Sequence, residues 1–165
     1  MSYPHLTLIV GGEERSVGSA GTLRLSDPAD GSELTVAPRA GRAEALEAAA
    51  AAEAGGAEWA ALSALERSKI MRRAADIMRE RANVAARVMS MEQGKPLAEA
   101  RGEWLGSADL LDWYAEEGRR VYGRIVPSRA PNIQIQVLKH PVGPVAAFTP
   151  WNFPAWNTMQ KVAPA

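Results

Sequence analysis

A single asparagine lies between two aromatic residues and two prolines in the segment Thr149-Pro150-Trp151-Asn152-Phe153-Pro154. The apolar run just before it, residues 144–148, predicts a buried strand. An amide held rigidly at the end of such a strand is a good oxyanion donor, because it needs no reorganisation as negative charge develops. The alternative is a packed turn whose amide satisfies backbone groups. The residues alone leave both interpretations open.

The other residue types that could do chemistry are few. The sequence has no cysteine and only two histidines, His5 and His140. Zero cysteine excludes a thiol nucleophile and a thiolate metal site within this chain. Two distant histidines argue against a Ser-His-Asp triad and a histidine-based metal site, so we predict no metal. The lack of cysteine also fits a cytoplasmic protein, and residues 1–5 show no secretory signal.

The charge balance restricts the class of partner. The 19 basic and 19 acidic residues cancel to a net charge of zero. Nucleic-acid and anionic-membrane partners are normally matched by a basic excess, and no apolar run approaches the length of a membrane span. We therefore expect neither nucleic acid nor a membrane as a partner.

The N-terminal part is predicted to form short strands followed by helices. Residues 6–10 with Gly11-Gly12 indicate one hairpin, and a turn at residues 27–31 indicates a second hairpin. Ser63 and Glu66 have the spacing of a capping box, which marks a helix start. Helices are expected over residues 42–54 before Gly55-Gly56, from Ser63, from Asn83 to Gly94, and from Pro96 towards residue 117.

The C-terminal part is predicted to be mainly extended. Residues 124–127 indicate a short strand, and residues 132–139 alternate in polarity, as in a strand with one wetter face. Residues 142–148 do not alternate, which favours a strand covered on both faces in a parallel sheet. A further helix is expected to begin at Thr158. The fold class is therefore α/β.

Four stretches of the chain, in the same order, make it resemble the N-terminal portion of an aldehyde dehydrogenase. The resemblance covers essentially the whole chain, and its last stretch, which begins at Thr149, is the most specific. The second stretch, residues 92–100, is similar to the branch of the family that contains succinate-semialdehyde dehydrogenases. The stretches are Asp27-Pro28-Ala29-Asp30-Gly31, residues 92–100 around Gly94-Lys95-Pro96, His140-Pro141-Val142-Gly143-Pro144-Val145, and residues 149–154 followed by Lys161-Val162-Ala163-Pro164-Ala165.

The resemblance implies roles for particular residues. Asn152 matches the asparagine of the family's oxyanion hole, which stabilises the tetrahedral intermediate on the aldehyde carbon. Phe148, Thr149, Pro150 and Trp151 match a segment that runs along the cofactor, NAD or NADP. Lys161 matches a lysine proposed to assist proton transfer, with an ordinary charged residue at a helix start as the alternative.

The resemblance also implies an incomplete fold in three parts. Residues 1–123 correspond to hairpins and a helical layer of the cofactor-binding domain, and residues 124–141 to strands that family members use for oligomerisation. Residues 142–165 correspond to the first strand of the parallel nucleotide-binding sheet and the active-site corner. The complete protein is expected to be a homo-oligomer that acts on a small aldehyde.

A family member uses a cysteine thiolate, a hydride acceptor and a glutamate that activates water. The cysteine is absent here and the glutamate is expected beyond Ala165, so this chain alone is predicted to be inactive. Two alternatives remain: a non-catalytic module that only pairs strands, and an unrelated helical domain with a fortuitous corner. Gly94-Lys95-Pro96 lacks the upstream glycine and following Ser or Thr of a phosphate loop, so a corner between two helices is the default there.

Overall fold

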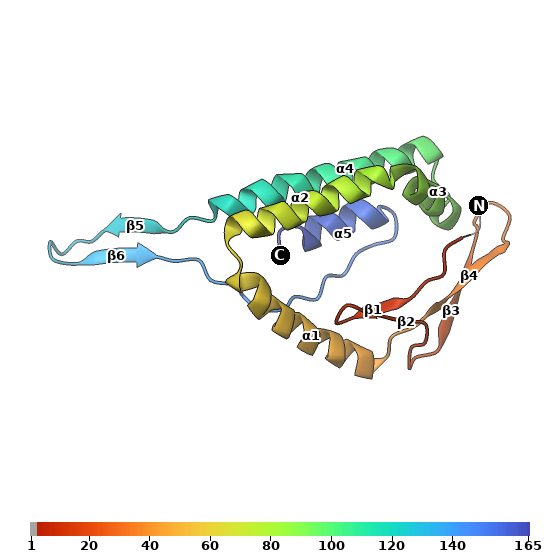
Figure 1. The fold of residues 1–165 in the computed structure, drawn as a ribbon, viewed down its shortest axis with the longest axis horizontal. Coiled ribbons are helices and arrows are strands. Elements are labelled where there is room, and N and C mark those ends of the chain that lie inside the picture. Colours follow the sequence, from red (N-terminus) through yellow and green to blue (C-terminus); the bar gives the residue numbers. More distant parts are fainter. Residues whose placement is uncertain (1–2) are drawn as a thin grey trace.

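The computed structural model describes residues 3–165, so residues 1–2 of the first predicted segment lie outside the described residues. A helical layer dominates it. Helices α2 (Ala64–Glu80) and α4 (Leu97–Glu117) lie side by side, α3 (Ala82–Gln93) joins their ends, and α5 (Pro154–Val162) lies against α4 (Figure 1). The predicted helical layer is thus confirmed.

The core of this layer is built largely from small side chains. One buried cluster contains Ala75, Ala108, Leu111 and Ala163, and joins α2, α4 and the end of α5. A second buried cluster, Ala86, Met89 and Ala100, joins α3 to α4. Alanine has a high helix propensity and lets helices approach closely. An alanine-rich chain can therefore form this layer with few large aliphatic residues.

Local signals set several helix ends as predicted. The Ser63 hydroxyl accepts a hydrogen bond from the Glu66 amide (3.2 Å), and the Glu66 carboxylate accepts one from the Ser63 amide (2.8 Å). Gly94 ends α3 in the left-handed conformation, with φ of 80°. A residue without a Cβ adopts that conformation at no steric cost. Pro96 immediately precedes α4.

Three other helix boundaries differ from the prediction. Helix α1 (Arg42–Ala61) continues through Gly55-Gly56, because its alanine-rich flanks outweigh about 1 kcal/mol per glycine. Asn83 does not cap α3, which begins at Ala82; its side chain instead accepts a hydrogen bond from Arg101 Nε (3.0 Å). Helix α5 begins at Pro154 rather than Thr158.

All the strands described here pair as antiparallel hairpins. They are β1 (Leu8–Val10) with β2 (Glu13–Arg15), β3 (Thr22–Ser26) with β4 (Glu33–Pro38), and β5 (Arg124–Pro127) with β6 (Gln134–Val137). The first turn uses Gly11 and Gly12, both with positive φ. The β5–β6 hairpin projects away from the helical layer (Figure 1). The two predicted N-terminal hairpins and the predicted strands at residues 124–127 and 132–139 are confirmed, the last as the shorter β6.

The predicted strand at residues 142–148 is not formed. This segment is irregular and exposed, with Val142 93% and Phe148 85% exposed. A strand in a parallel sheet needs a hydrogen-bonded neighbour on at least one side, and the described residues provide none. The apolar run therefore lies open to solvent, and the predicted parallel sheet does not appear in residues 3–165.

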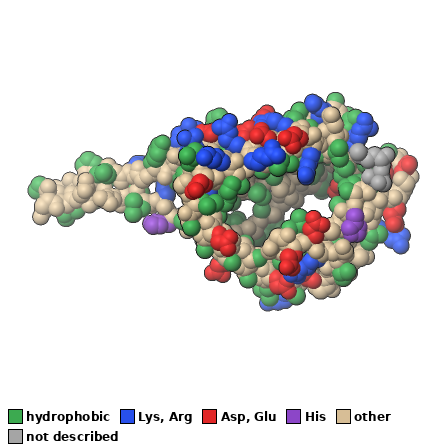
Figure 2. All heavy atoms as spheres, viewed as in Figure 1, with side chains coloured by type: hydrophobic (Ala, Val, Ile, Leu, Met, Phe, Trp, Pro, Cys, Tyr) green, Lys and Arg blue, Asp and Glu red, His purple; other side chains and the backbone are tan. Residues whose placement is uncertain are grey.

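The space-filling view shows a hollow between the helical layer and the α1 and hairpin side, with hydrophobic side chains visible inside it (Figure 2). Lys, Arg, Asp and Glu side chains are interspersed over the helical layer in this view. Among the described residues, no helix has both the length and the apolar character that crossing a bilayer requires.

Candidate functional site

The aromatic corner, which we define as residues 151–154, leads directly into α5. Pro154 occupies the first turn of that helix, where its missing N–H costs nothing. The Phe153 backbone, at φ −135° and ψ 69°, lies outside the helical region, and no side chain of the corner itself caps the helix. The cap must therefore come from elsewhere in the chain.

Glu103 of α4 provides that cap. Its Oε1 accepts hydrogen bonds from the backbone amides of Ala155 (2.9 Å) and Trp156 (3.2 Å). Free amides and the helix dipole give a helix N-terminus a partial positive charge, which favours a carboxylate. The Glu103 side chain is only 3% exposed, so these bonds are sheltered from water.

Lys95, at the α3–α4 corner, joins the same group of residues. Its Nζ forms an ion pair with Glu103 Oε2 and donates a hydrogen bond to the main-chain oxygen of Asn152 (3.0 Å). The ammonium also lies 4.3 Å from the centre of the Phe153 ring, within the range of a cation–π contact. The Lys95 side chain is 8% exposed. The predicted helix-to-helix corner at Gly94-Lys95-Pro96 is confirmed, and its lysine holds the aromatic corner.

Side-chain packing between α5 and α4 reinforces this arrangement. The Trp156 ring lies against Gly106 of α4, where a Cβ would come within 3.2 Å of the ring. The Thr158 hydroxyl donates to the Pro154 carbonyl oxygen (2.6 Å) within α5. Helix α5 is thus fixed to α4 by a buried carboxylate at its start and by a close aromatic contact from the same first turn.

The residues expected to do chemistry are accessible. Asn152 is exposed, and Trp151 is 77% exposed. Among the hydrogen bonds of the described residues, none involves the Asn152 side-chain amide; only its backbone oxygen is engaged. The packed-turn interpretation, in which this amide satisfies backbone groups, is therefore not what the structure forms. The Asn152 amide is free to donate to another molecule or segment.

The remaining predicted residues are not gathered around Asn152. Lys161 is exposed in the last turn of α5, whereas Asn152 precedes the first turn of that helix. Phe148, Thr149 and Pro150 lie in the irregular, exposed segment that precedes the aromatic corner. The structure therefore joins Trp151 and Asn152 to the helical layer and leaves the other four at a distance or without cover.

A large apolar cavity adjoins the aromatic corner. It has a volume of about 900 Å³, and its walls include Met78, Met89, Trp104, Trp151 and Met159. These residues come from α2, α3, α4, the corner and α5. Gln93 also lines the cavity, and its Oε1 is buried with no hydrogen-bond partner among residues 3–165. A largely apolar surface with few polar groups is suited to binding rather than to proton transfer.

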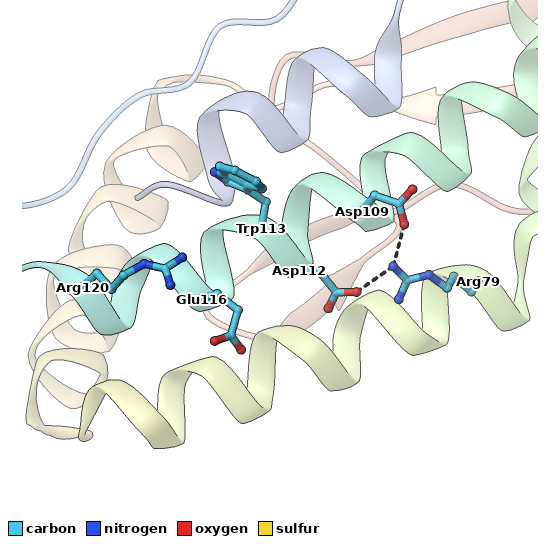
Figure 3. A pocket seen from close by; sticks show the side chains of 6 residues that line it. All are labelled: Arg79, Asp109, Asp112, Trp113, Glu116 and Arg120. Atoms are coloured by element: carbon cyan, nitrogen blue, oxygen red, sulfur yellow. Dashed lines mark hydrogen bonds and ion pairs between the residues drawn. The ribbon is translucent and has the colours of Figure 1, made fainter.

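A second cavity, of about 430 Å³, is charged and has a structural explanation. Arg79 of α2 points toward Asp109 and Asp112 of α4 (Figure 3), with Nη2 2.7 Å and 2.6 Å from their carboxylate oxygens. Hydrogen bonds to these two carboxylates raise the pKa of the Arg79 guanidinium. The cluster ties two helices together and contains no nucleophile. In the described part of the chain, no three carboxylates or imidazoles gather to hold a metal ion.

The described residues offer only part of a binding site for the dinucleotide expected from the sequence. Phe148 to Trp151 offer exposed rings and backbone groups along one side. Helix N-termini often bind phosphate, but the first amides of α5 already bind Glu103. The exposed rings and backbone groups of residues 148–151 would flank a dinucleotide, and the start of α5 does not provide its phosphate site.

Sequence reasoning missed Lys95 and Glu103 as a pair. The only signal was indirect, because a lysine between glycine and proline at a helix corner is held in a restricted position. Nothing in the sequence indicates that Glu103, eight residues later, faces it. The link to Ala155 spans 52 residues, so only the tertiary fold reveals it.

Comparison with known proteins gives a consistent result. Residues 16–165 match the aldehyde dehydrogenase family. The chain is 41% identical to glutarate-semialdehyde dehydrogenase of Pseudomonas putida over 94% of its length and 32% of that protein. It is 40% identical to the succinate-semialdehyde dehydrogenase (NADP(+)) GabD of Escherichia coli over 95% of its length and 33% of that protein.

The fold agrees with the sequence comparison. The crystal structure of succinate-semialdehyde dehydrogenase from Burkholderia pseudomallei superposes with a TM-score of 0.93 at 43% identity, over 96% of this chain and 33% of that one. The chain spans about a third of the length of these relatives. The hypothesis of an unrelated helical domain with a fortuitous corner is therefore wrong.

Proposed function

Because the chain belongs to the aldehyde dehydrogenase family, we propose that it forms the N-terminal third of an NAD(P)-dependent enzyme that oxidises an aldehyde to a carboxylic acid. The observation that carries this proposal is the Asn152 corner. Its backbone is held by a buried ion pair, while its side-chain amide remains free and exposed. Holding the backbone that carries this amide reduces the rearrangement needed to meet developing negative charge.

The role proposed for Asn152 is one of the donors of an oxyanion hole. When a thiolate adds to the aldehyde carbon, the carbonyl π electrons move to the oxygen, which becomes negatively charged. An Asn152 N–H would donate a hydrogen bond to that oxygen. Bound NAD(P) supplies the acceptor for the hydride that leaves the same carbon. The thiolate must come from outside these residues, because the sequence contains no cysteine.

The substrate class is proposed from the relatives. The two proteins compared above are named for glutarate semialdehyde and succinate semialdehyde. Both compounds have an aldehyde at one end and a carboxylate at the other. We propose a semialdehyde of this kind for the complete protein, and NAD or NADP as its cofactor. We also propose a cytoplasmic location and a homo-oligomeric assembly for the complete protein.

The isolated chain is proposed to be inactive. Without a nucleophile no covalent intermediate forms, so a free oxyanion donor has no charge to stabilise. The test is NAD(P)H absorbance with purified chain, succinate semialdehyde, and NAD or NADP. We expect no production above the protein-free control, and sustained production at a rate proportional to chain concentration would overturn the proposal.

A strand-pairing role is the second candidate, and the β5–β6 hairpin favours it. This two-stranded hairpin projects from the helical layer and exposes Ile125, Ile133, Ile135 and Leu138. Its outer edges carry unpaired backbone groups, which readily accept another strand. Sizing chromatography combined with an NAD titration separates the candidates, because assembly without cofactor binding favours the pairing module.

A further inference from the structure

Lys95 and Glu103 contact the aromatic corner in a way that stabilises one particular backbone geometry. The Lys95 ammonium contacts Glu103, the Asn152 carbonyl oxygen and the Phe153 ring. Glu103 uses its second oxygen for the amides of Ala155 and Trp156. One ion pair thus contacts the residues on both sides of the bend at Pro154.

Stability alone is a weak explanation for such a pair. Removing two charges from water costs several kcal/mol per ion, and replacing a buried ion pair by apolar residues is often neutral or stabilising. A buried ion pair can instead select one conformation among several. The segment before the corner, residues 138–150, has no regular secondary structure and is exposed. Few other contacts therefore restrict the backbone of Asn152 from the N-terminal side.

We propose that Lys95 and Glu103 are positioning residues for Asn152. Lys95 holds the Asn152 carbonyl, and Glu103 fixes both Lys95 and the start of α5. The direction of the Asn152 side chain follows from these two constraints. The inference rests on the proposed function, because a fixed amide matters only if it binds a developing oxyanion.

The experiment uses the 165-residue chain and ¹⁵N NMR. Backbone heteronuclear NOE values report the order of Asn152 and Phe153, and amide exchange reports the cap at Ala155 and Trp156. In the unsubstituted chain we expect Asn152 to be as ordered as the middle of α4. If Asn152 is as mobile as residues 145–148, the proposal is overturned.

Three variants separate positioning from simple stabilisation. Glu103→Ala removes the cap and the anchor of Lys95, so both Asn152 order and α5 amide protection should fall, the latter by roughly 10- to 100-fold. Glu103→Gln keeps an acceptor for the amides and should retain most of that protection. Lys95→Met should loosen Asn152 and Phe153 more than it exposes the Ala155 and Trp156 amides, because their acceptor Glu103 remains.

The double variant Lys95→Met/Glu103→Gln guards against misfolding, because it leaves no lone buried charge. It should keep the cap and the thermal melt of the helical layer but lose the order of Asn152. Arg79→Met is the matched control, since it breaks an ion pair between α2 and α4 away from the corner and should leave Asn152 unchanged. Equal loosening of the corner and the helices in every variant, or an unchanged corner in Lys95→Met, would refute the positioning role. These readouts need no catalysis, so they stand or fall separately from the enzymatic proposal.

Discussion

The ammonium of Lys95 donates a hydrogen bond to the main-chain oxygen of Asn152 across 3.0 Å, although 57 residues separate them in sequence. The contact joins the α3–α4 corner to the bend before α5. It leaves the side-chain amide of Asn152 free, because only the backbone oxygen is used. The helical layer therefore holds the backbone of Asn152 through this contact.

The buried and exposed ion pairs should respond differently to truncation. Lys95→Met leaves the Glu103 carboxylate buried without its partner, and should lower the free energy of unfolding by about 3 kcal/mol. Arg79→Met breaks a pair whose arginine is 35% exposed, and should cost less than about 1 kcal/mol. Urea titrations followed by circular dichroism would check both values. Equal losses would show that burial does not decide the strength of these pairs.

The contact between Gly106 and Trp156 predicts a position-specific response to alanine. Gly106→Ala places a methyl group 3.2 Å from the Trp156 ring, and crowding should offset the helix-propensity gain. Gly102→Ala lies on the same helix with nothing within 4 Å, and should stabilise the chain by about 1 kcal/mol. We expect Gly106→Ala to be less stable than Gly102→Ala by about 1–2 kcal/mol. Equal stabilities would show that α5 does not pack as described.

The backbone of Gly94 predicts intolerance of any side chain. Its φ is 80°, and an added Cβ would lie 2.9 Å from Pro28 Cγ. Gly94→Ala should therefore cost about 1–2 kcal/mol from the left-handed conformation, plus the cost of moving Pro28. Gly55→Ala, in the exposed helix α1, should instead raise stability by about 1 kcal/mol. Thermal melts of the two variants should shift in opposite directions, and a shared direction would contradict this account.

Glu44 predicts a pH dependence. Hydrogen bonds from the Ser19 side chain, and from nearby backbone amides, lower the pKa of its carboxyl from 4.5 to about 2. Because the folded chain holds the ionised form more strongly, this contribution to stability is present above pH 4.5. It is lost as the pH falls from about 4.5 to about 2. A ¹³C NMR titration of Glu44 should give the low pKa, and Ser19→Ala should raise it toward 4.5; an ordinary pKa in the unsubstituted chain would count against the contact.

Signals that depend only on adjacent residues predicted much of this fold correctly. A signal whose outcome depends on a distant covering element gave a wrong prediction. The Ser63–Glu66 capping box and the stop at Gly94 need only neighbouring residues, and both were predicted. The strand expected at residues 142–148 depends on a neighbour that the chain does not supply among its described residues. Periodicity describes a side chain's preference for burial, and it cannot show that a covering element exists.

The residues of the candidate site also divide into those that the sequence indicates and those that only the tertiary fold reveals. Asn152 was identified by its rigid, aromatic surroundings and by resemblance to a family. Glu103 was not identified, because a glutamate on an amphipathic helix usually faces solvent. Its role depends on Ala155 and Trp156, which the sequence places far away. A pairing of this kind becomes visible only when the corner and the helix are seen packed together.

The central claim, that Asn152 is an oxyanion donor, can be tested in a chimera. These 165 residues would replace the corresponding third of the Escherichia coli succinate-semialdehyde dehydrogenase (NADP(+)), to which the chain is 40% identical. We predict that the chimera oxidises succinate semialdehyde with NADP, and that Asn152→Ala lowers kcat by about 10²–10³ with little change in KM. An active chimera whose kcat is unaffected by Asn152→Ala would contradict the claim.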